Sequence, residues 1–132
     1  MAELIEVLIA EDNDPDALLV KEAIAEIGLP AGVSVVTNGE EALAFLRKEG
    51  KFASSPKPNL IILDLGMPRM SGEEFLQKAD QLLDGVRVLI MSGSPEMTPA
   101  VRSLPYRKVA KPFTGEDFEA LMVVLRDMLS NL

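Results

Sequence analysis

The chain contains no cysteine and no histidine among its 132 residues. Without cysteine it can form no disulfide, use no thiol nucleophile and bind no metal through sulfur. Without histidine it lacks the commonest transition-metal ligand and the usual general base of enzymes. Chemistry at metals or phosphates would therefore depend on oxygen ligands and on lysine or arginine side chains.

Long hydrophobic runs and an excess of basic residues are also absent. No apolar stretch approaches the ~18 residues of a transmembrane helix, and residues 1–3, "MAE", lack the basic start of a secretory signal. We therefore expect no membrane association and a cytoplasmic location. Lys and Arg total 13 against 21 Asp and Glu, which gives a net charge of −8. Such an acidic chain is a poor candidate for binding nucleic acid by itself.

Strand-like apolar runs alternate with helical patterns along the whole chain. Hydrophobic residues make up 48% of the sequence, and the length fits one domain with a sizeable core. The alternation predicts a parallel sheet with helices on both faces, and continuous apolar runs are typical of strands covered on both sides. The expected strands are residues 4–10, 33–37, 60–63, 86–91 and 108–110; the expected helices are residues 14–28 and 39–48, one after Ser71 and one after Thr114. Residues 92–105 contain three prolines, so any helix there is short.

Acidic residues stand at the ends of two of the expected strands. Glu11 and Asp12 follow the first strand, and Asp64 ends the third. Ligands of open α/β sheets bind outside the carboxyl ends of the strands. If the first and third strands are neighbours, three carboxylates converge. Two carboxylates ~5 Å apart repel by roughly 3 kcal/mol at an effective dielectric of ~20, so the cluster needs a cation or a raised pKa.

Two further strand ends carry groups that suit phosphoryl transfer. Ser92 ends the fourth strand, and Lys111 follows the fifth. Oxygen ligands favour Mg²⁺, and a metal, an ammonium group and a hydroxyl around one carboxylate suit phosphorylation of that carboxylate, Asp64. Taken singly, each residue also has an ordinary interpretation, as a helix cap, a loop acid, a turn serine or a solvated lysine. Their joint placement at four strand ends favours a functional site.

The same motifs identify a resemblance to the receiver domains of bacterial two-component response regulators. It spans nearly the whole chain, and it rests on "VLIAEDN", "LIILDLGMPRMSG", "VLIMSGS" and "AKPF" in the family's order and spacing. The resemblance implies a single receiver domain over residues 1–132 with a flavodoxin-like (βα)5 sandwich and a five-stranded parallel sheet of order 2-1-3-4-5. The long loop after the second helix resembles that of small stand-alone regulators, including those partnered with bacterial phytochromes. Met1 favours a stand-alone chain over the alternative of a receiver cut from a larger protein.

The resemblance also implies a role for each strand-end residue. Asp64 would accept a phosphoryl group from a histidine kinase or a phosphotransfer protein. Asp12 and Glu11 would bind Mg²⁺ with Asp64 and the carbonyl of Gly66. The hydroxyl of Ser92 would turn toward the phosphoryl group. Lys111 would pair with a phosphoryl oxygen, and its bond to Pro112 would be cis. Beyond slow self-catalysed phosphorylation and dephosphorylation, we expect no enzyme activity.

Three departures from the family pattern concern how the signal is transmitted. Lys108 stands where an aromatic residue is common, and Tyr106 lies two residues earlier. The short, proline-rich segment after Ser92 predicts an abbreviated fourth helix. Gly66 and Ser94 occupy positions that tune dephosphorylation, and neither side chain can orient a hydrolytic water well. We therefore expect a long-lived phosphoryl group.

The last helix leaves two interpretations of its apolar residues. Phe118, Leu121, Leu125, Met128 and Leu132 form a stripe that Met122, Val123, Val124 and Leu129 widen. This is either a broad buried face or a partner surface, for example a homodimer through the fourth helix, fifth strand and fifth helix. The nearby basic residues Arg102, Arg107 and Lys108 form either a solvated face or a contact with acids of a twin subunit.

Three other functions compete with the phosphoacceptor hypothesis. A pseudo-receiver would bind partners without phosphorylation, which the altered Lys108 region keeps open and the intact acids disfavour. A flavodoxin-like cofactor binder would need a phosphate-cradling loop after the first strand, where this chain has "EDNDPD". A phosphatase with an aspartate nucleophile would commonly need a second acid two residues later, where this chain has Gly66.

Overall fold

A five-stranded parallel sheet forms the centre of the molecule, with strand order β2-β1-β3-β4-β5. The computed structural model describes residues 4–93, 102–112 and 114–130. The predicted sheet order is confirmed, and each predicted strand end lies within two residues of the observed one. The strands are Ile5–Ala10 (β1), Ala31–Val36 (β2), Leu60–Asp64 (β3), Arg87–Ser92 (β4) and Arg107–Ala110 (β5).

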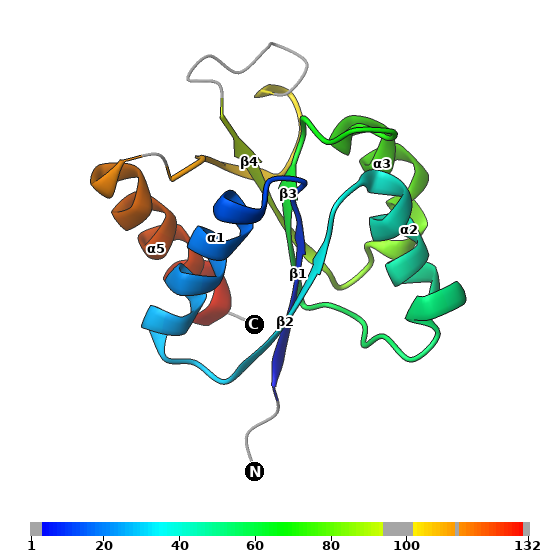
Figure 1. Cartoon of the computed structure of the whole chain (residues 1–132), viewed down its shortest axis with the longest axis horizontal. Coiled ribbons are helices and arrows are strands. Elements are labelled where there is room, and N and C mark those ends of the chain that lie inside the picture. The colour runs from blue at the N-terminus through cyan, green and yellow to red at the C-terminus, as the bar shows by residue number, and fades with distance from the viewer. Residues whose placement is uncertain (1–3, 94–101, 113, 131–132) are drawn as a thin grey trace.

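Helices cover both faces of the sheet, as Figure 1 shows with the sheet seen nearly edge-on. Helices α1 and α5 lie side by side on one face, and α2 and α3 lie on the other. The carboxyl ends of the strands all lie at the top of that view. The helices are Asp14–Ile27 (α1), Gly39–Arg47 (α2), Gly72–Lys78 (α3) and Gly115–Ser130 (α5), with short 3₁₀ turns at Gly50–Phe52 and Asp80–Leu82.

Each helix begins at a side chain that accepts a backbone hydrogen bond. Asn13 caps α1 by accepting from the N–H of Asp16. Ser71 caps α3 by accepting from the N–H of Glu74, which is one of the two hydrogen bonds of a capping box. Thr114 accepts from the N–H of Asp117 at the start of α5. These caps fix where each helix leaves the strand ends, and therefore where its first turn lies.

The strands β1, β3 and β4 are buried on both faces, which explains their continuous apolar sequences. Alternate residues pack into one cluster under α2 and α3, and the intervening ones pack into a second under α1 and α5. In α5, Leu121, Leu125, Met128 and Leu129 are buried, whereas Val123 is 59% exposed. The apolar stripe is thus a core face with one residue outside it. Leu132 lies outside the described residues.

Among the residues that the structure describes, no helix is long and apolar enough to cross a membrane. The proline-rich segment after Ser92 and the predicted fourth helix fall mostly on residues 94–101, which lie outside the described residues, as does Ser94. The homodimer predicted through that helix therefore stays a prediction.

Candidate phosphoacceptor and metal site

Three carboxylates meet where β1 and β3 end. The two strands are paired in register, with Ala10 opposite Leu63, so Glu11 and Asp64 emerge side by side. One oxygen of each of Glu11, Asp12 and Asp64 lies within 4.8 Å of the others. Glu11 is 0% exposed and Asp64 is 5% exposed, while Asp12 faces solvent. The predicted convergence of these acids is confirmed.

Lys111 brings a positive charge into the middle of this acidic cluster. Its Nζ lies 3.2 Å from Oδ2 of Asp64 and 3.1 Å from Oε2 of Glu11, and the side chain is only 11% exposed. The backbone N–H of Lys111 donates to the carbonyl of Ser92 over 2.8 Å, which ties the residue to the end of β4. Ser92 itself is half-buried at that strand end. Three of the four predicted strand ends therefore bring their side chains together, and the end of β4 contacts Lys111 through the backbone carbonyl of Ser92. The role predicted for the Ser92 hydroxyl stays a prediction.

Asp16 also contacts Lys111, and the sequence analysis missed it. Its Oδ2 lies 3.2 Å from Nζ of Lys111, because the first turn of α1 starts directly over the ends of β1 and β3. A signal was present in the sequence. The cap at Asn13 places Asp16 at the third helical position, whose side chain lies over the strand end.

The surroundings of the cluster shift the pKa of two of its groups. Burial, and secondarily the neighbouring charge of Asp64, raise the pKa of Glu11 to about 7, although hydrogen bonds from Asn13 and Lys111 act in the opposite direction. Burial alone would lower the pKa of Lys111, but hydrogen bonds and charge from Glu11 and Asp64 outweigh it and raise that pKa. The lysine thus stays positively charged. Its single charge does not balance the three clustered carboxylates.

The chemistry of these donors fits a hard divalent cation. Oε2 of Glu11 is buried and accepts no hydrogen bond from the described residues, even though Lys111 is within ion-pair distance. A buried carboxylate oxygen without a hydrogen bond lowers the stability of the fold unless a bound cation compensates its charge. Gly66 has no side chain beside Asp64, where a Cβ would lie 3.7 Å from Oδ1, so a ligand can approach the carboxylate from this side. The N–H of Gly66 donates to the same oxygen over 3.1 Å.

The loop between β3 and α3 is packed tightly against two helix starts. A Cβ on Gly39, at the start of α2, would lie 2.6 Å from the carbonyl oxygen of Met70. A Cβ on Gly72 would lie 2.9 Å from Cα of Leu65. Arg69, inside the loop, has a φ of 67°, a conformation that non-glycine residues adopt at a cost. Close packing of glycines therefore holds the loop that follows Asp64 in place.

The expected cis bond between Lys111 and Pro112 is wrong. The structure has no cis peptide bond among the residues that it describes, so this bond is trans. The trans isomer is the more stable form of most bonds before proline, by ~0.5–1 kcal/mol. From the trans backbone the lysine side chain already reaches Asp64, Glu11 and Asp16, so the contacts of this site do not require the cis form.

The basic residues near β5 are engaged within the chain. Arg107 pairs with Asp127 of α5. The amine of Lys108 donates to the carbonyls of Leu104 and Tyr106, both over 2.7 Å. Lys108 therefore closes the turn before β5, where the family pattern has an aromatic residue. Two of the three predicted basic residues thus have partners inside one molecule.

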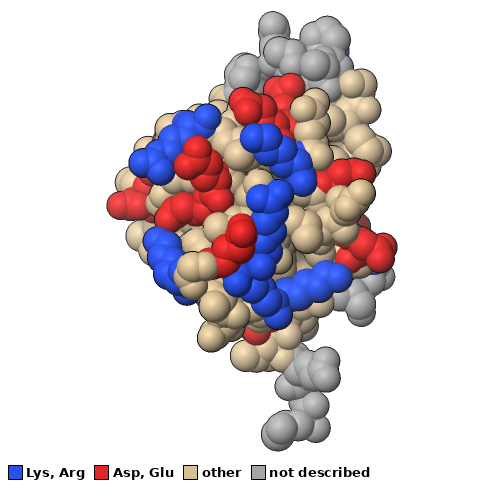
Figure 2. Space-filling view, turned by 90° about the vertical axis from the view of Figure 1, so that its right-hand side faces the viewer, with Lys and Arg blue, Asp and Glu red and all other residues tan. Residues whose placement is uncertain are grey.

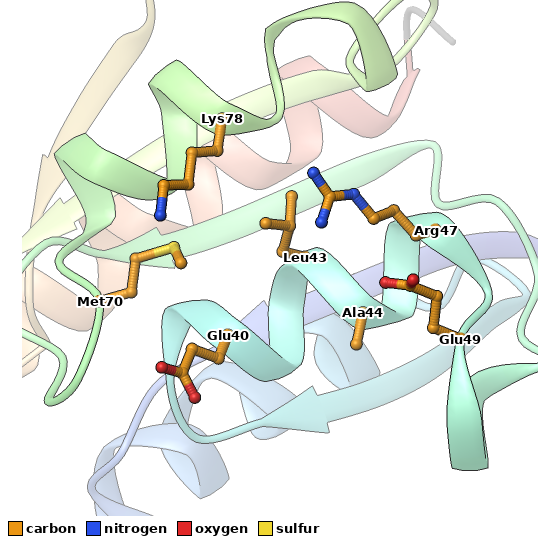
Figure 3. Close-up of a pocket in the computed structure, with 7 residues that line it drawn as sticks. All are labelled: Glu40, Leu43, Ala44, Arg47, Glu49, Met70 and Lys78. Carbon is orange, nitrogen blue, oxygen red and sulfur yellow. The ribbon is translucent and has the colours of Figure 1, made fainter.

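A groove between α2 and α3 lies apart from the strand-end site. It has a volume of about 540 Å³ and a floor that includes Leu43 and Met70. Arg47 and Lys78 reach toward its middle from opposite helices, as Figure 3 shows. Lys and Arg side chains form a band over this face of the molecule, with acids on both sides (Figure 2). Glu40 and Glu49 also line the groove and balance its two cations, so it selects no ligand by net charge.

Comparison with known proteins agrees with this geometry. The family model of the response regulator receiver domain matches residues 7–122. Response regulator Rcp1 of Synechocystis sp. is 34% identical over 85 residues, which cover 64% of this chain and 58% of that relative. The match thus spans less than two thirds of the length of Rcp1.

Two solved structures cover nearly the whole chain. The phosphorylated cyanobacterial phytochrome response regulator RcpA is 29% identical with a TM-score of 0.85, and the match covers 98% of this chain and 97% of RcpA. The Mn²⁺-bound form of Rcp1 is 27% identical with a TM-score of 0.84, over 96% of each chain. By its sequence and its flavodoxin-like fold, the chain belongs to the response regulator receiver domains and is similar to the regulators of phytochrome signalling.

Proposed function

We propose that this receiver domain accepts a phosphoryl group on Asp64 from the phosphohistidine of a sensor histidine kinase or a phosphotransfer protein. One observation carries the proposal. A carboxylate that is 5% exposed lies at the carboxyl edge of the sheet, 3.2 Å from a lysine ammonium and beside two further acids. This arrangement combines a nucleophile, a cation for the incoming oxygens and ligands for a metal.

The transfer exchanges one bond to phosphorus for another. An oxygen of Asp64 attacks the phosphorus, and a P–O bond forms as the P–N bond of the phosphohistidine breaks. The ring nitrogen keeps the electron pair of that bond, and the histidine leaves as a neutral imidazole with its proton on the other ring nitrogen. The product is an aspartyl phosphate. Lys111 lies where it can pair with one oxygen of the transferred group, and Ser92 can approach another from the end of β4. Positioning and charge neutralisation are the main contributions of a protein to this kind of reaction.

Mg²⁺ is the proposed cofactor, held by Glu11, Asp12, Asp64 and the carbonyl of Gly66. When bound, it supplies positive charge to the phosphoryl oxygens and offsets the repulsion between the carboxylates. The buried Oε2 of Glu11, which accepts no hydrogen bond from the described residues and has only the ion pair with Lys111, supports this assignment. Mg²⁺ is chosen over softer metals because the donors are all oxygens.

The proposed role is a switch in a two-component pathway. Phosphorylation changes the charge at the edge of the sheet and would alter the surface offered to a downstream protein. The similarity to phytochrome response regulators makes a phytochrome-type histidine kinase the first donor to test. We do not propose binding to nucleic acid or membrane.

The test is the intact mass of the protein after incubation with acetyl phosphate and Mg²⁺. We expect the addition of one phosphoryl group, which is lost in Asp64→Asn and in the presence of a chelator. Asp80→Asn is the matched control, because Asp80 is exposed and lies in the 3₁₀ turn after α3 rather than at a strand end, and it should label normally. Absence of labelling under conditions that label another receiver would instead support a pseudo-receiver that binds partners without phosphorylation.

A further inference from the structure

Lys111 is shared by three acids, of which only two belong to the metal cluster. Its Nζ lies 3.1–3.2 Å from carboxylate oxygens of Glu11, Asp16 and Asp64. Glu11 and Asp64 are also two of the three clustered carboxylates that could hold a metal ion, and Asp16 is not. The three contacts of the lysine are therefore not equivalent once a cation is bound.

A divalent cation on Glu11 and Asp64 would weaken both of their contacts with the lysine. The negative charge of each acid would then be drawn to the metal, and the metal and the ammonium group would repel each other. Asp16 would keep its full charge for Lys111. Of the three acids, it is the one that can hold the lysine at the site in the metal-bound state.

The placement of Asp16 suits this task. Its backbone N–H is fixed by the side chain of Asn13 over 3.0 Å, so the carboxylate stands on the rigid first turn of α1. The side chain of Asp16 is 15% exposed, against 11% for Lys111, so solvent screens their interaction less than it would a surface pair. Asp14, in the same turn, faces solvent and is not among the three acids that pair with the lysine.

We propose that Asp16 is a positioning residue, which keeps the ammonium group of Lys111 beside the phosphoacceptor while the other two acids bind the metal. The inference rests on the proposed function. Without Asp16, the lysine would form ion pairs with Glu11 and Asp64 alone and would compete with the metal ion for these two acids. In the metal-bound protein it would then have no acid to hold it within reach of the transferred phosphoryl oxygens.

The first test is Mg²⁺ binding, followed by calorimetry or by the amide resonances around Asp64. We expect Asp16→Asn to weaken Mg²⁺ affinity by about tenfold, the lower end of the range for outer-shell residues. Asp14→Asn removes the same charge from the same turn and should leave the affinity within about twofold. In a Lys111→Met background, Asp16→Asn should have no more effect than Asp14→Asn, because the competing lysine is gone.

The second test is the rate of phosphorylation by acetyl phosphate at saturating Mg²⁺. We expect a loss of about tenfold for Asp16→Asn, partial recovery in Asp16→Glu, no loss in Asp14→Asn, and no further loss from Asp16→Asn when Lys111 is already Met. Unchanged amide spectra away from the site would exclude a general loss of structure.

The results separate this inference from the proposed function. If the wild-type protein takes up no phosphoryl group, the proposed function fails, and the Mg²⁺ titration still decides the role of Asp16. If Asp16→Asn behaves like Asp14→Asn in both tests, or has its full effect without Lys111, the inference is overturned.

Discussion

Nζ of Lys111 and Oδ2 of Asp64 lie 3.2 Å apart, although the strand before the lysine and the strand that ends in the aspartate are not neighbours. Strand β4 lies between them. The lysine crosses over the end of β4, where its own N–H is held by the carbonyl of Ser92. This link makes the charge balance of the site depend on residues from four strand ends.

Lys111→Met should destabilise the protein most strongly when Mg²⁺ is absent. It leaves buried Glu11 and Asp64 without their cation, and breaking a buried ion pair costs about 3 kcal/mol or more. Saturating Mg²⁺ should recover much of that loss, because the metal compensates the same acids and binds only the folded state. Urea unfolding with and without Mg²⁺ measures both effects.

Lys21→Met, on an exposed position of α1, is the control and should change stability by less than about 0.5 kcal/mol. An equal loss for Lys111→Met with and without Mg²⁺ would show that the metal and the lysine do not act on the same acids.

Gly39→Ala and Gly72→Ala should each reduce the free energy of unfolding by about 1–3 kcal/mol. In an ordinary helix the change to alanine gains up to ~1 kcal/mol, but here each new Cβ would meet backbone atoms at less than 3.0 Å. The loop after Asp64 would have to shift, so the phosphorylation rate should fall as well.

Gly115→Ala is the matched control for both variants, because it is also at a helix start and a Cβ there meets nothing within 4 Å. Its stability, from the same urea titration, should equal or exceed that of the wild type. A neutral Gly39→Ala would mean that the loop is not packed as described.

Glu41 should stabilise the protein at neutral pH and lose this effect in acid. Its side chain accepts from the N–H and hydroxyl of Thr37 and from Lys51, and the backbone hydrogen bond, foremost among these, lowers its pKa from 4.5 to about 2. A lowered pKa in the folded state stabilises at pH values above 4.5, and the contribution disappears as the pH falls from 4.5 toward 2.

Glu41→Gln should therefore be less stable than the wild type by about 1 kcal/mol at pH 7. The free energies of unfolding of the two proteins, followed against pH, should converge as the pH approaches 2. Thermal unfolding over that range provides the measurement, with Glu22→Gln as an exposed control. Curves that remain parallel down to pH 2 would contradict the assignment.

The aspartyl phosphate should be long-lived, and Gly66→Asn should shorten its lifetime by about tenfold. Glycine offers no side chain to orient a water molecule, whereas an amide beside Asp64 can hold one in line for attack. The added Cβ would sit at an ordinary contact distance of 3.7 Å from the carboxylate. Loss of the phosphoryl mass over time, compared with that in Gly115→Asn, is the measurement. Equal lifetimes in the two variants would show that this position does not control hydrolysis.

The local structure of this chain could be predicted from its sequence because local interactions determine it. Apolar runs of strand length gave the five strands, and Asn13, Ser71 and Thr114 gave the helix starts through short-range capping bonds. Glu11, Asp12 and Asp64 could be placed at one edge, since parallel strands direct their carboxyl ends to the same side.

Contacts between distant segments were decided only by the tertiary structure. Asp16 joins Lys111 across 95 positions because the first turn of α1 lies over the strand ends, and no local pattern encodes that distance. Three other features likewise depend on how close separate elements come. They are the trans bond before Pro112, the tight packing of Gly39 on Met70 and the hydrogen bonds that Lys108 donates to two carbonyls. The sequence by itself therefore determined which groups reach the edge of the sheet. The packing of helices on the strands decided which of them touch, because a contact of 3 Å depends on small shifts of whole elements.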